Sequence, residues 1–220
     1  MTSQTSATIR TATPGAVGFD CNTVLTTQTA TAFRSAGFTF AIRYLSRNTP
    51  ESAGDLSAPE TAAILAAGLA LMAVQHVQAS GWTPSQSLGT QYGNAAVTNA
   101  KAAGLPAGTS VWLDLEGVSS AATATVIESY CNAWSAAVSG GGYRPGIYVG
   151  ANCGVTSSQI EALDFQYFWK SGSSVPALSN PGYCMVQQIG SGYEVDGVAY
   201  DKDTVQAGVS PLPVWAVSTG

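Results

Sequence analysis

Short apolar stretches alternate with longer amphipathic segments along most of the chain. The apolar stretches are rich in β-branched and aromatic side chains, which is typical of buried strands. They lie at residues 16–20, 38–44, 69–75, 110–115, 145–149, 165–169, 183–188 and 198–200. Between the first six stretches, apolar residues recur at helical spacing, which predicts helices. These helices lie at about residues 26–36, 57–68, 85–103, 121–139 and 156–163.

Residue types at the ends of these segments support the boundaries. Gly37 and Gly104 each follow a helical segment, where a glycine commonly ends a helix. Residues 57–60 combine a serine cap, an early proline and an acidic third position, which is a usual helix start. The rhythm changes later, because residues 171–182 hold two prolines and show no helical period. The last two predicted strands are therefore joined without helices.

Repeated strand–helix units indicate an α/β fold built on a parallel sheet. Eight strands with about five helices indicate a TIM-type barrel whose outer ring of helices is incomplete. An open doubly wound sheet is the alternative, although no glycine-rich dinucleotide-binding turn follows the first strand. We expect residues 1–14, which are polar and rich in threonine, to form a flexible lead-in. Residues 15–220 are then expected to form a single barrel domain.

Composition restricts the classes of function. Only 10% of the residues are charged, the net charge is −5, and the 8 lysines and arginines are scattered, which argues against nucleic-acid binding. No apolar run approaches the roughly 20 residues of a membrane span. The N-terminal residues show neither the basic nor the apolar region of a secretory signal. A protein acting at the cell wall or outside the cell would then need a non-classical export route. We expect a monomer without a cofactor.

The four cysteines do not indicate a metal site. They are Cys21, Cys131, Cys153 and Cys184. No C-x-x-C spacing occurs, so neither zinc nor a redox motif is expected. In a protein that folds in the cytoplasm we expect buried thiols, and the pairing of any disulfide stays open.

The few charged side chains gather where predicted strands end. Asp114 and Glu116 end the fourth strand and, being two residues apart, point to the same face. Other polar residues end or follow strands in the same way: Asp20, Arg43, His76, Lys170, Gln187, Gln188, Asp201 and Asp203. The carboxyl ends of barrel strands meet at one mouth, so we expect these side chains to share one pocket.

Two carboxyl groups on one face are the minimum equipment for cleaving a glycosidic bond. A serine triad would have to use His76, the only histidine, and the chain lacks a G-x-S-x-G elbow between a strand and a helix. A cysteine–histidine pair has no local signature. A metal held by Asp114, Glu116, Asp201 and Asp203 stays open, since hard cations take oxygen ligands.

Several stretches at these strand ends resemble the family 25 lysozymes, muramidases that cleave peptidoglycan. They are Gly18-Phe19-Asp20, Asp114-Leu115-Glu116, Gly146-Ile147-Tyr148-Val149-Gly150, and Gln187-Gln188 leading to Tyr200-Asp201-Lys202-Asp203. The closer resemblance, over residues 16–203, is to a bacterial family of glycoside-hydrolase-like domains related to those lysozymes. It implies a lysozyme-like barrel with eight strands and five helices. It also implies a hydrolase acting on peptidoglycan or a related amino-sugar polymer.

The same resemblance implies roles for the acids. Glu116 matches the general acid, and Asp114 matches the neighbour that orients the substrate or its acetamido group. Asp20 and Asp201 match the acids of the first and last strands. One of these two, or the N-acetyl group of the substrate, would stabilise the transition state.

The substrate contacts expected from the strand ends and the resemblance are Asp203, Arg43, His76, Tyr148, Trp169 and Gln187. Arg43 has a second reading, as the salt-bridge partner of a carboxylate. Two features depart from the family 25 pattern. Asp203 stands where those lysozymes usually have asparagine, and Val186-Gln187-Gln188 replaces their Trp-Gln-Tyr. These departures leave a second hypothesis open, a catalytically inactive barrel that binds cell-wall glycan.

Overall fold

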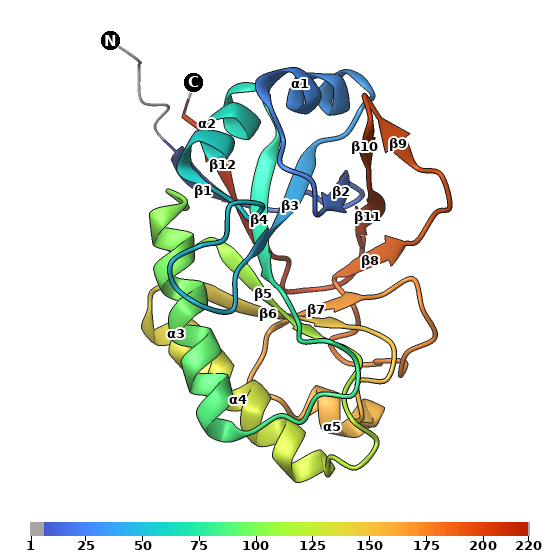
Figure 1. Ribbon diagram of the computed structural model, residues 1–220. Helices are drawn as coiled ribbons and strands as arrows, with labels where there is room; N and C mark the ends of the chain where they lie inside the picture. Colours follow the sequence, from blue (N-terminus) through green and yellow to red (C-terminus); the bar gives the residue numbers. More distant parts are fainter. Residues whose placement is uncertain (1–6, 220) are drawn as a thin grey trace.

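A closed barrel of eight strands organises residues 7–219, the part of the chain that the computed structural model describes (Figure 1). Seven strands run parallel and in chain order: β2 (Val17–Cys21), β3 (Phe40–Leu45), β4 (Ala70–Gln75), β5 (Ser110–Leu115), β6 (Arg144–Val149), β7 (Tyr167–Lys170) and β8 (Met185–Gln188). The eighth, β11 (Asp201–Val205), runs antiparallel between β8 and β2 and closes the ring. The predicted TIM-type barrel is confirmed, and ring closure excludes the open doubly wound sheet.

The last barrel strand is not the predicted one. Residues 198–200 were expected to form it, but β10 (Val198–Ala199) pairs with β9 (Glu194–Val195) in a small hairpin outside the ring. The barrel strand is β11, which begins at Asp201. It was missed because acids occupy its first inward positions, where a buried strand normally carries apolar residues. Since β11 is antiparallel, its first residues lie at the same rim as the last residues of the parallel strands.

Two further strands lie beside the ring. β1 (Ala7–Thr11) pairs antiparallel with β12 (Val214–Ser218), and β12 contacts the barrel through Ala216 and Leu71 of β4. The expected lead-in over residues 1–14 is therefore wrong for residues 7–11, because this segment is a strand that gains backbone hydrogen bonds from β12. Residues 1–6 lie outside the described residues.

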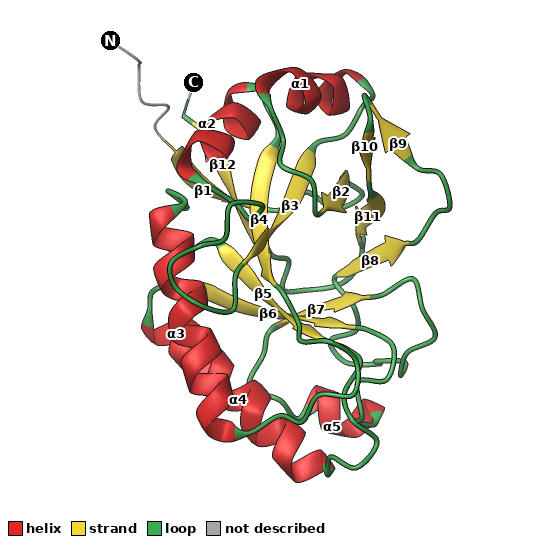
Figure 2. Ribbon diagram, in the orientation of Figure 1, coloured by secondary structure: helices red, strands yellow, loops and turns green. Residues whose placement is uncertain are grey.

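Five helices lie in the described part, in agreement with the prediction: α1 (Thr27–Ser35), α2 (Ala58–Ala66), α3 (Gln86–Ala102), α4 (Ala124–Gly140) and α5 (Ser157–Glu161). Thr26, Ser57 and Ser85 cap the first three through side-chain oxygens that accept backbone N–H groups. Helices α3 and α4 lie side by side along one flank (Figure 2). Among residues 7–219, no helix follows β8, so the outer ring of helices is incomplete. No helix in this range is long and apolar enough to cross a membrane.

The apolar core forms two layers. The larger layer lies between the strands and the helices, and the smaller fills the barrel with Phe40, Met72, Trp112, Trp169 and other buried side chains. Gly146 makes room for this filling, since a Cβ there would lie 2.5 Å from the Trp112 ring. The four cysteines are buried and free, as expected.

Candidate active site

Five carboxyl groups lie at the rim formed by the carboxyl ends of the parallel strands. Asp20 is at the end of β2, Asp114 near the end of β5 and Glu116 just beyond it. Asp201 and Asp203 belong to β11, and Asp201 pairs in register with Asp20. The sequence therefore predicted correctly which acids meet, although it placed two of them after a strand rather than within one.

A cavity of about 190 Å³ opens at this rim. Its lining includes Tyr44, Asp114, Glu116, Tyr148, Gln187 and Asp201. A second cavity of about 360 Å³ adjoins it, sharing Tyr44 and Asp201 and adding Asp20 together with residues of the β9–β10 hairpin. Among the described residues that line either cavity, none is a lysine, arginine or histidine. The mouth is therefore acidic and has no positive charge in its walls.

Asp114 and Glu116 share this mouth but differ in exposure. Asp114 is 6% exposed, and its Oδ1 has no hydrogen-bond partner within the described chain. Burial raises its pKa well above the ordinary value, and the charges of Glu116 and Asp20 add to the effect. Glu116 is half-buried, and burial raises its pKa as well. Its backbone is held by Trp82, whose Nε1 donates to the Glu116 carbonyl oxygen at 2.8 Å.

Gln187 connects the acids of β2 and β11. Its Nε2 donates to Asp20 Oδ2 at 2.8 Å and lies 3.5 Å from Asp201 Oδ2, and its Oε1 accepts from the Tyr148 hydroxyl at 2.9 Å. Tyr44 donates a longer bond, 3.4 Å, to the other oxygen of Asp20. Burial raises the pKa of Asp20 to about 7, and the hydrogen bond from Gln187 opposes that rise. The expected contacts Gln187 and Tyr148 thus form part of the cavity wall.

Asp203 and Trp169 lie deeper in the barrel than the other predicted contacts. Asp203 is fully buried, and Trp169 Nε1 donates to its Oδ1 at 2.9 Å. Trp169 is 1% exposed but still contributes to the cavity lining. Asp203 therefore lies behind the cavity surface and is placed to act through its neighbours.

Besides Asp203, two further expected substrate contacts do not line the mouth. Arg43 is fully buried and pairs with Glu60 of α2, with 2.6 Å between Arg43 Nε and Glu60 Oε1. The prediction that Arg43 contacts substrate is therefore wrong, and its salt-bridge reading holds. His76 is part-exposed and lines neither cavity, but its ring stacks on Tyr44, which lines both, with centroids 4.5 Å apart. Its Nε2 is 2.7 Å from Asp55 Oδ1.

Part of the cavity lining was not predicted. Ser173 and Ile189 line it from the irregular segments that follow β7 and β8. Loops of this kind carry no hydrophobic period, so spacing could not place them. Tyr44, which lies near the end of a predicted strand beside Arg43, was expected as an aromatic residue of the cleft, and it lines both cavities.

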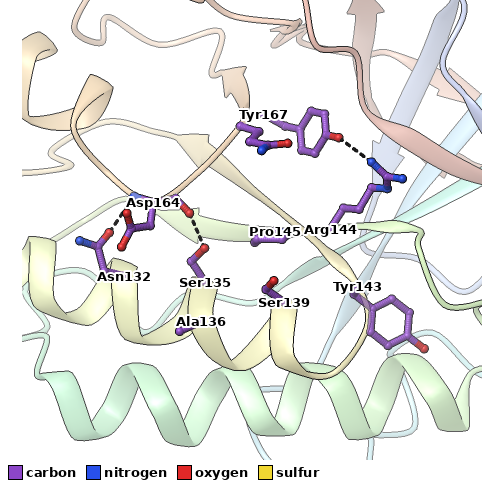
Figure 3. A pocket seen from close by; sticks show the side chains of 10 residues that line it. Asn132, Ser135, Ala136, Ser139, Tyr143, Arg144, Pro145, Asp164 and Tyr167 are labelled. Carbon is purple, nitrogen blue, oxygen red and sulfur yellow. Dashed lines mark hydrogen bonds between the residues drawn. The ribbon is translucent and has the colours of Figure 1, made fainter.

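A larger cavity, about 380 Å³, lies beside α4 (Figure 3). It is at the end of the barrel opposite the acidic mouth, because residues at the starts of two parallel strands line it. It adjoins Arg144 at the start of β6 and Tyr167 at the start of β7, and Arg144 Nη1 donates to the Tyr167 hydroxyl at 3.2 Å. Asp164 is the single acid in its lining. A lone acid cannot supply the carboxyl pair of a glycosidase. The acidic mouth is therefore the better candidate for the active site. Within residues 7–219, no group of three histidine, cysteine, aspartate or glutamate side chains could hold a metal ion.

Comparison with known protein families identifies the kind of domain. The family model described as "Rv2525c-like, glycoside hydrolase-like domain" matches residues 31–205. Among curated proteins, the comparison finds no match.

Solved structures share the fold at low sequence identity. The Tat-secreted protein Rv2525c of Mycobacterium tuberculosis is 20% identical with a TM-score of 0.67, and the match covers 88% of this chain and 96% of that one. A lysozyme of Streptomyces coelicolor is 19% identical with a TM-score of 0.60, over 90% and 95% of the two chains. The autolysin LytC of Streptococcus pneumoniae, solved with a synthetic peptidoglycan ligand, is 10% identical with a TM-score of 0.57, over 91% and 46%.

Proposed function

Since the chain belongs to the Rv2525c-like glycoside hydrolase-like domain family, we propose that it hydrolyses a β-linked amino-sugar polymer, with peptidoglycan as the leading candidate. The observation that carries this proposal is the Asp114–Glu116 pair at one open mouth, facing Asp20 and Asp201 across it. Two of the structures with the same fold are a lysozyme and an autolysin solved with a peptidoglycan ligand, which favours this substrate class.

Glu116 is the proposed proton donor. A general acid must be protonated at the working pH and must reach the leaving oxygen of the glycosidic bond. Burial raises the pKa of Glu116, while its half-exposed side chain lines the cavity. Asp114 is too deeply buried for this role, and its place in the cavity lining beside Glu116 suits it to orient the substrate.

The opposite wall provides the second acid. Asp20 receives hydrogen bonds from Gln187 and Tyr44, so its orientation is set before substrate arrives. In its ionised form it would stabilise the positive charge that develops at the anomeric carbon, or would orient the N-acetyl group that attacks there. Asp201, which lines both cavities and is more exposed, is the alternative for the same role.

The proposal places the protein at the cell wall. Rv2525c, which shares the fold, is a Tat-secreted protein. A wall-cleaving enzyme has its substrate outside the cytoplasm, so we propose that this chain is exported as well. Fractionation of producing cells, with the chain detected by antibody, tests the proposal, and confinement to the cytoplasm would contradict it.

The decisive experiment compares wild type with Glu116→Gln on purified peptidoglycan. Wild type should release reducing ends and clear a wall suspension, whereas the variant should lose at least a hundredfold in rate because it cannot donate the proton. Glu128→Gln, on the surface of α4, is the matched control and should retain full activity. Equal rates for wild type and Glu116→Gln would exclude Glu116 as the acid.

The second candidate function is a barrel that binds wall glycan without cleaving it. It is favoured by Asp203, which puts a fully buried acid where family 25 lysozymes usually carry an amide. This candidate predicts that wild type sediments with walls but releases no reducing ends. Cleavage by wild type that depends on Glu116 would exclude it.

A further inference from the structure

A second carboxyl group lies directly behind Asp20, inside the barrel. Asp203 is fully buried, and its register partner on β2 is Gly18, which presents no side chain. Asp20 follows two residues further along the same face of β2. The carboxyl groups of Asp20 and Asp203 are in hydrogen-bonding contact there.

The groups packed around this pair do not neutralise it. The titratable groups that act on Asp20 or Asp203, or lie beside them, are Asp201 on β11, Cys21 on β2, Tyr44 on β3, Asp114 and Glu116 at the end of β5, and Tyr148 on β6. Arg43 lies beyond Cys21, and its charge is matched by Glu60. Lys202 lies between Asp201 and Asp203 on β11, but successive side chains of a strand point to opposite faces. No positive group is among the largest influences on Asp20 or Asp203.

The Asp203 carboxyl group has only one conventional donor. Trp169 satisfies Oδ1 at 2.9 Å, whereas Oδ2 receives no bond from an N–H or hydroxyl group of the described residues. Its surroundings are the aromatic filling of the barrel, where an ionised carboxylate with one donor is strongly disfavoured. Two acids in contact in such a place cannot both be ionised, so one of them keeps a proton and its O–H donates a hydrogen bond to the other.

We propose that Asp203 is a positioning residue that stays protonated and donates a hydrogen bond to Asp20, so that Asp20 alone carries the charge facing the substrate. Asp203 does not touch the substrate. It holds Asp20 in place from behind, as Gln187 and Tyr44 do from the sides. The inference rests on the proposed glycosidase, since it names the residue that keeps the second acid ionised.

The pKa shifts of the two acids agree with a proton on Asp203 rather than on Asp20. Burial raises the pKa of Asp203 well above the ordinary aspartate value, and the neighbouring Asp20 raises it further. Burial raises the pKa of Asp20 to about 7, whereas its hydrogen bonds with Gln187, Asp203 and Tyr44 lower it. Asp20 is therefore the first of the two to lose its proton as the pH rises.

The first test counts protons and needs no activity. Near neutral pH an unfolded aspartate, with a pKa of about 3.9, is ionised. Wild type should therefore release about one more proton per molecule on unfolding than Asp203→Asn, as measured by calorimetry in buffers of different ionisation enthalpy. Asp164→Asn, an exposed acid at the other end of the barrel, is the control and should release as many as wild type. An equal count for wild type and Asp203→Asn overturns the proposal.

The second test follows the pH profile of kcat/KM on peptidoglycan. Asp203→Asn keeps an N–H that can donate to Asp20, so it should retain the acid limb of wild type and at least a third of the rate. Asp203→Leu removes the donor, so the pKa of Asp20 should rise and the acid limb should move to higher pH by about one unit. An unshifted limb in Asp203→Leu, or a collapse of activity in a folded Asp203→Asn, overturns the positioning role.

The two tests separate this inference from the proposed function. If wild type cleaves no glycan but the proton count differs by one, the buried protonated acid stands and the glycosidase fails. If wild type cleaves glycan but the counts are equal, the glycosidase stands and Asp203 is not the proton holder. Should Asp203→Leu fail to fold, the proton count and the profile of Asp203→Asn still decide the outcome.

Discussion

Gly150, at the carboxyl end of β6, lies against the side chain of Glu116. A Cβ at Gly150 would be 2.5 Å from Glu116 Oε2 and 2.6 Å from Glu116 Cβ, distances that real contacts do not reach. The proposed proton donor therefore keeps its orientation because the neighbouring strand presents no side chain at this point. The missing side chain at Gly150 therefore leaves the space that the Glu116 side chain occupies.

Replacing Gly150 by alanine should misplace the acid while leaving the fold intact. A displacement of about 1 Å at a reacting group can cost about a hundredfold in rate. We expect kcat for Gly150→Ala to fall by ten- to a hundredfold, with little change in the midpoint of thermal unfolding. Gly140→Ala, at the end of α4 where no atom lies within 4 Å of an added Cβ, is the control. Full activity of Gly150→Ala would show that Glu116 does not need this orientation.

Gln187 should control the acid limb of the pH profile. Its hydrogen bond lowers the pKa of Asp20, which burial has raised to about 7. In Gln187→Leu that pKa should rise further, so Asp20 becomes ionised only at higher pH and activity at mildly acidic pH is lost. Initial rates across a pH series test this, with the exposed neighbour in Gln188→Leu as control. A profile that coincides with wild type would contradict the role of Gln187.

Removing Arg43 should destabilise the protein without acting on catalysis directly. Arg43 is fully buried and also donates to backbone oxygens of Cys21 and Gly54, so Arg43→Met leaves Glu60 buried and unpaired. Breaking a buried pair in this way costs about 3–5 kcal/mol. Urea unfolding should show this loss, and the double variant Arg43→Met/Glu60→Met should recover part of it. A loss no larger than that of a surface charge would contradict the structural role.

Stability should fall as the pH rises from acidic to neutral. Burial raises the pKa of Asp20 to about 7, and raises the pKa of Asp114 and of Asp203 well above the ordinary range. The folded protein therefore keeps protons that the unfolded chain loses above a pKa of about 3.9. These protonated acids stabilise the folded state fully at a pH below the unfolded-state pKa. The stabilisation is lost as the pH rises toward the folded-state pKa, by about 1.4 kcal/mol per pH unit for each retained proton.

Calorimetric scans over this pH range test the direction of the effect. The midpoint of unfolding should decrease between about pH 4 and pH 7, where the unfolded acids of pKa about 3.9 are ionised. The decrease should be smaller in Asp114→Asn, because that variant has one retained proton fewer. A midpoint that rises steadily toward neutral pH would show that these acids are ionised in the folded state.

The acids of the site could be predicted because they interrupt apolar strands at the point where parallel strands converge. Asp20, Asp114 and Glu116 carry this signal in the sequence alone. Asp201 and Asp203 were brought to the correct rim by the wrong reasoning, since they begin an antiparallel strand rather than follow a parallel one. Strand direction is a property of the closed ring, and no local pattern records it.

Other features depend on contacts that spacing does not encode. Arg43 has the position of a mouth residue, but its long side chain turns to Glu60 between β3 and α2. β1 forms because the end of the chain supplies β12 as its partner. Ser173 and Ile189 lie on loops without a period, so only tertiary structure brings them to the cavity.

The acidic site cannot assemble until β11, the antiparallel strand that closes the barrel, has been synthesised. Asp20 and Gln187 are bonded on the same wall of the mouth although they are 167 positions apart. Strand β11 lies between their strands and follows both in the chain. While the polypeptide is being synthesised, Asp20 is made early, but its partners from β8 and β11 emerge near the end. A growing or truncated chain that stops before β11 therefore holds Glu116 and Asp20 without Asp201 and Asp203.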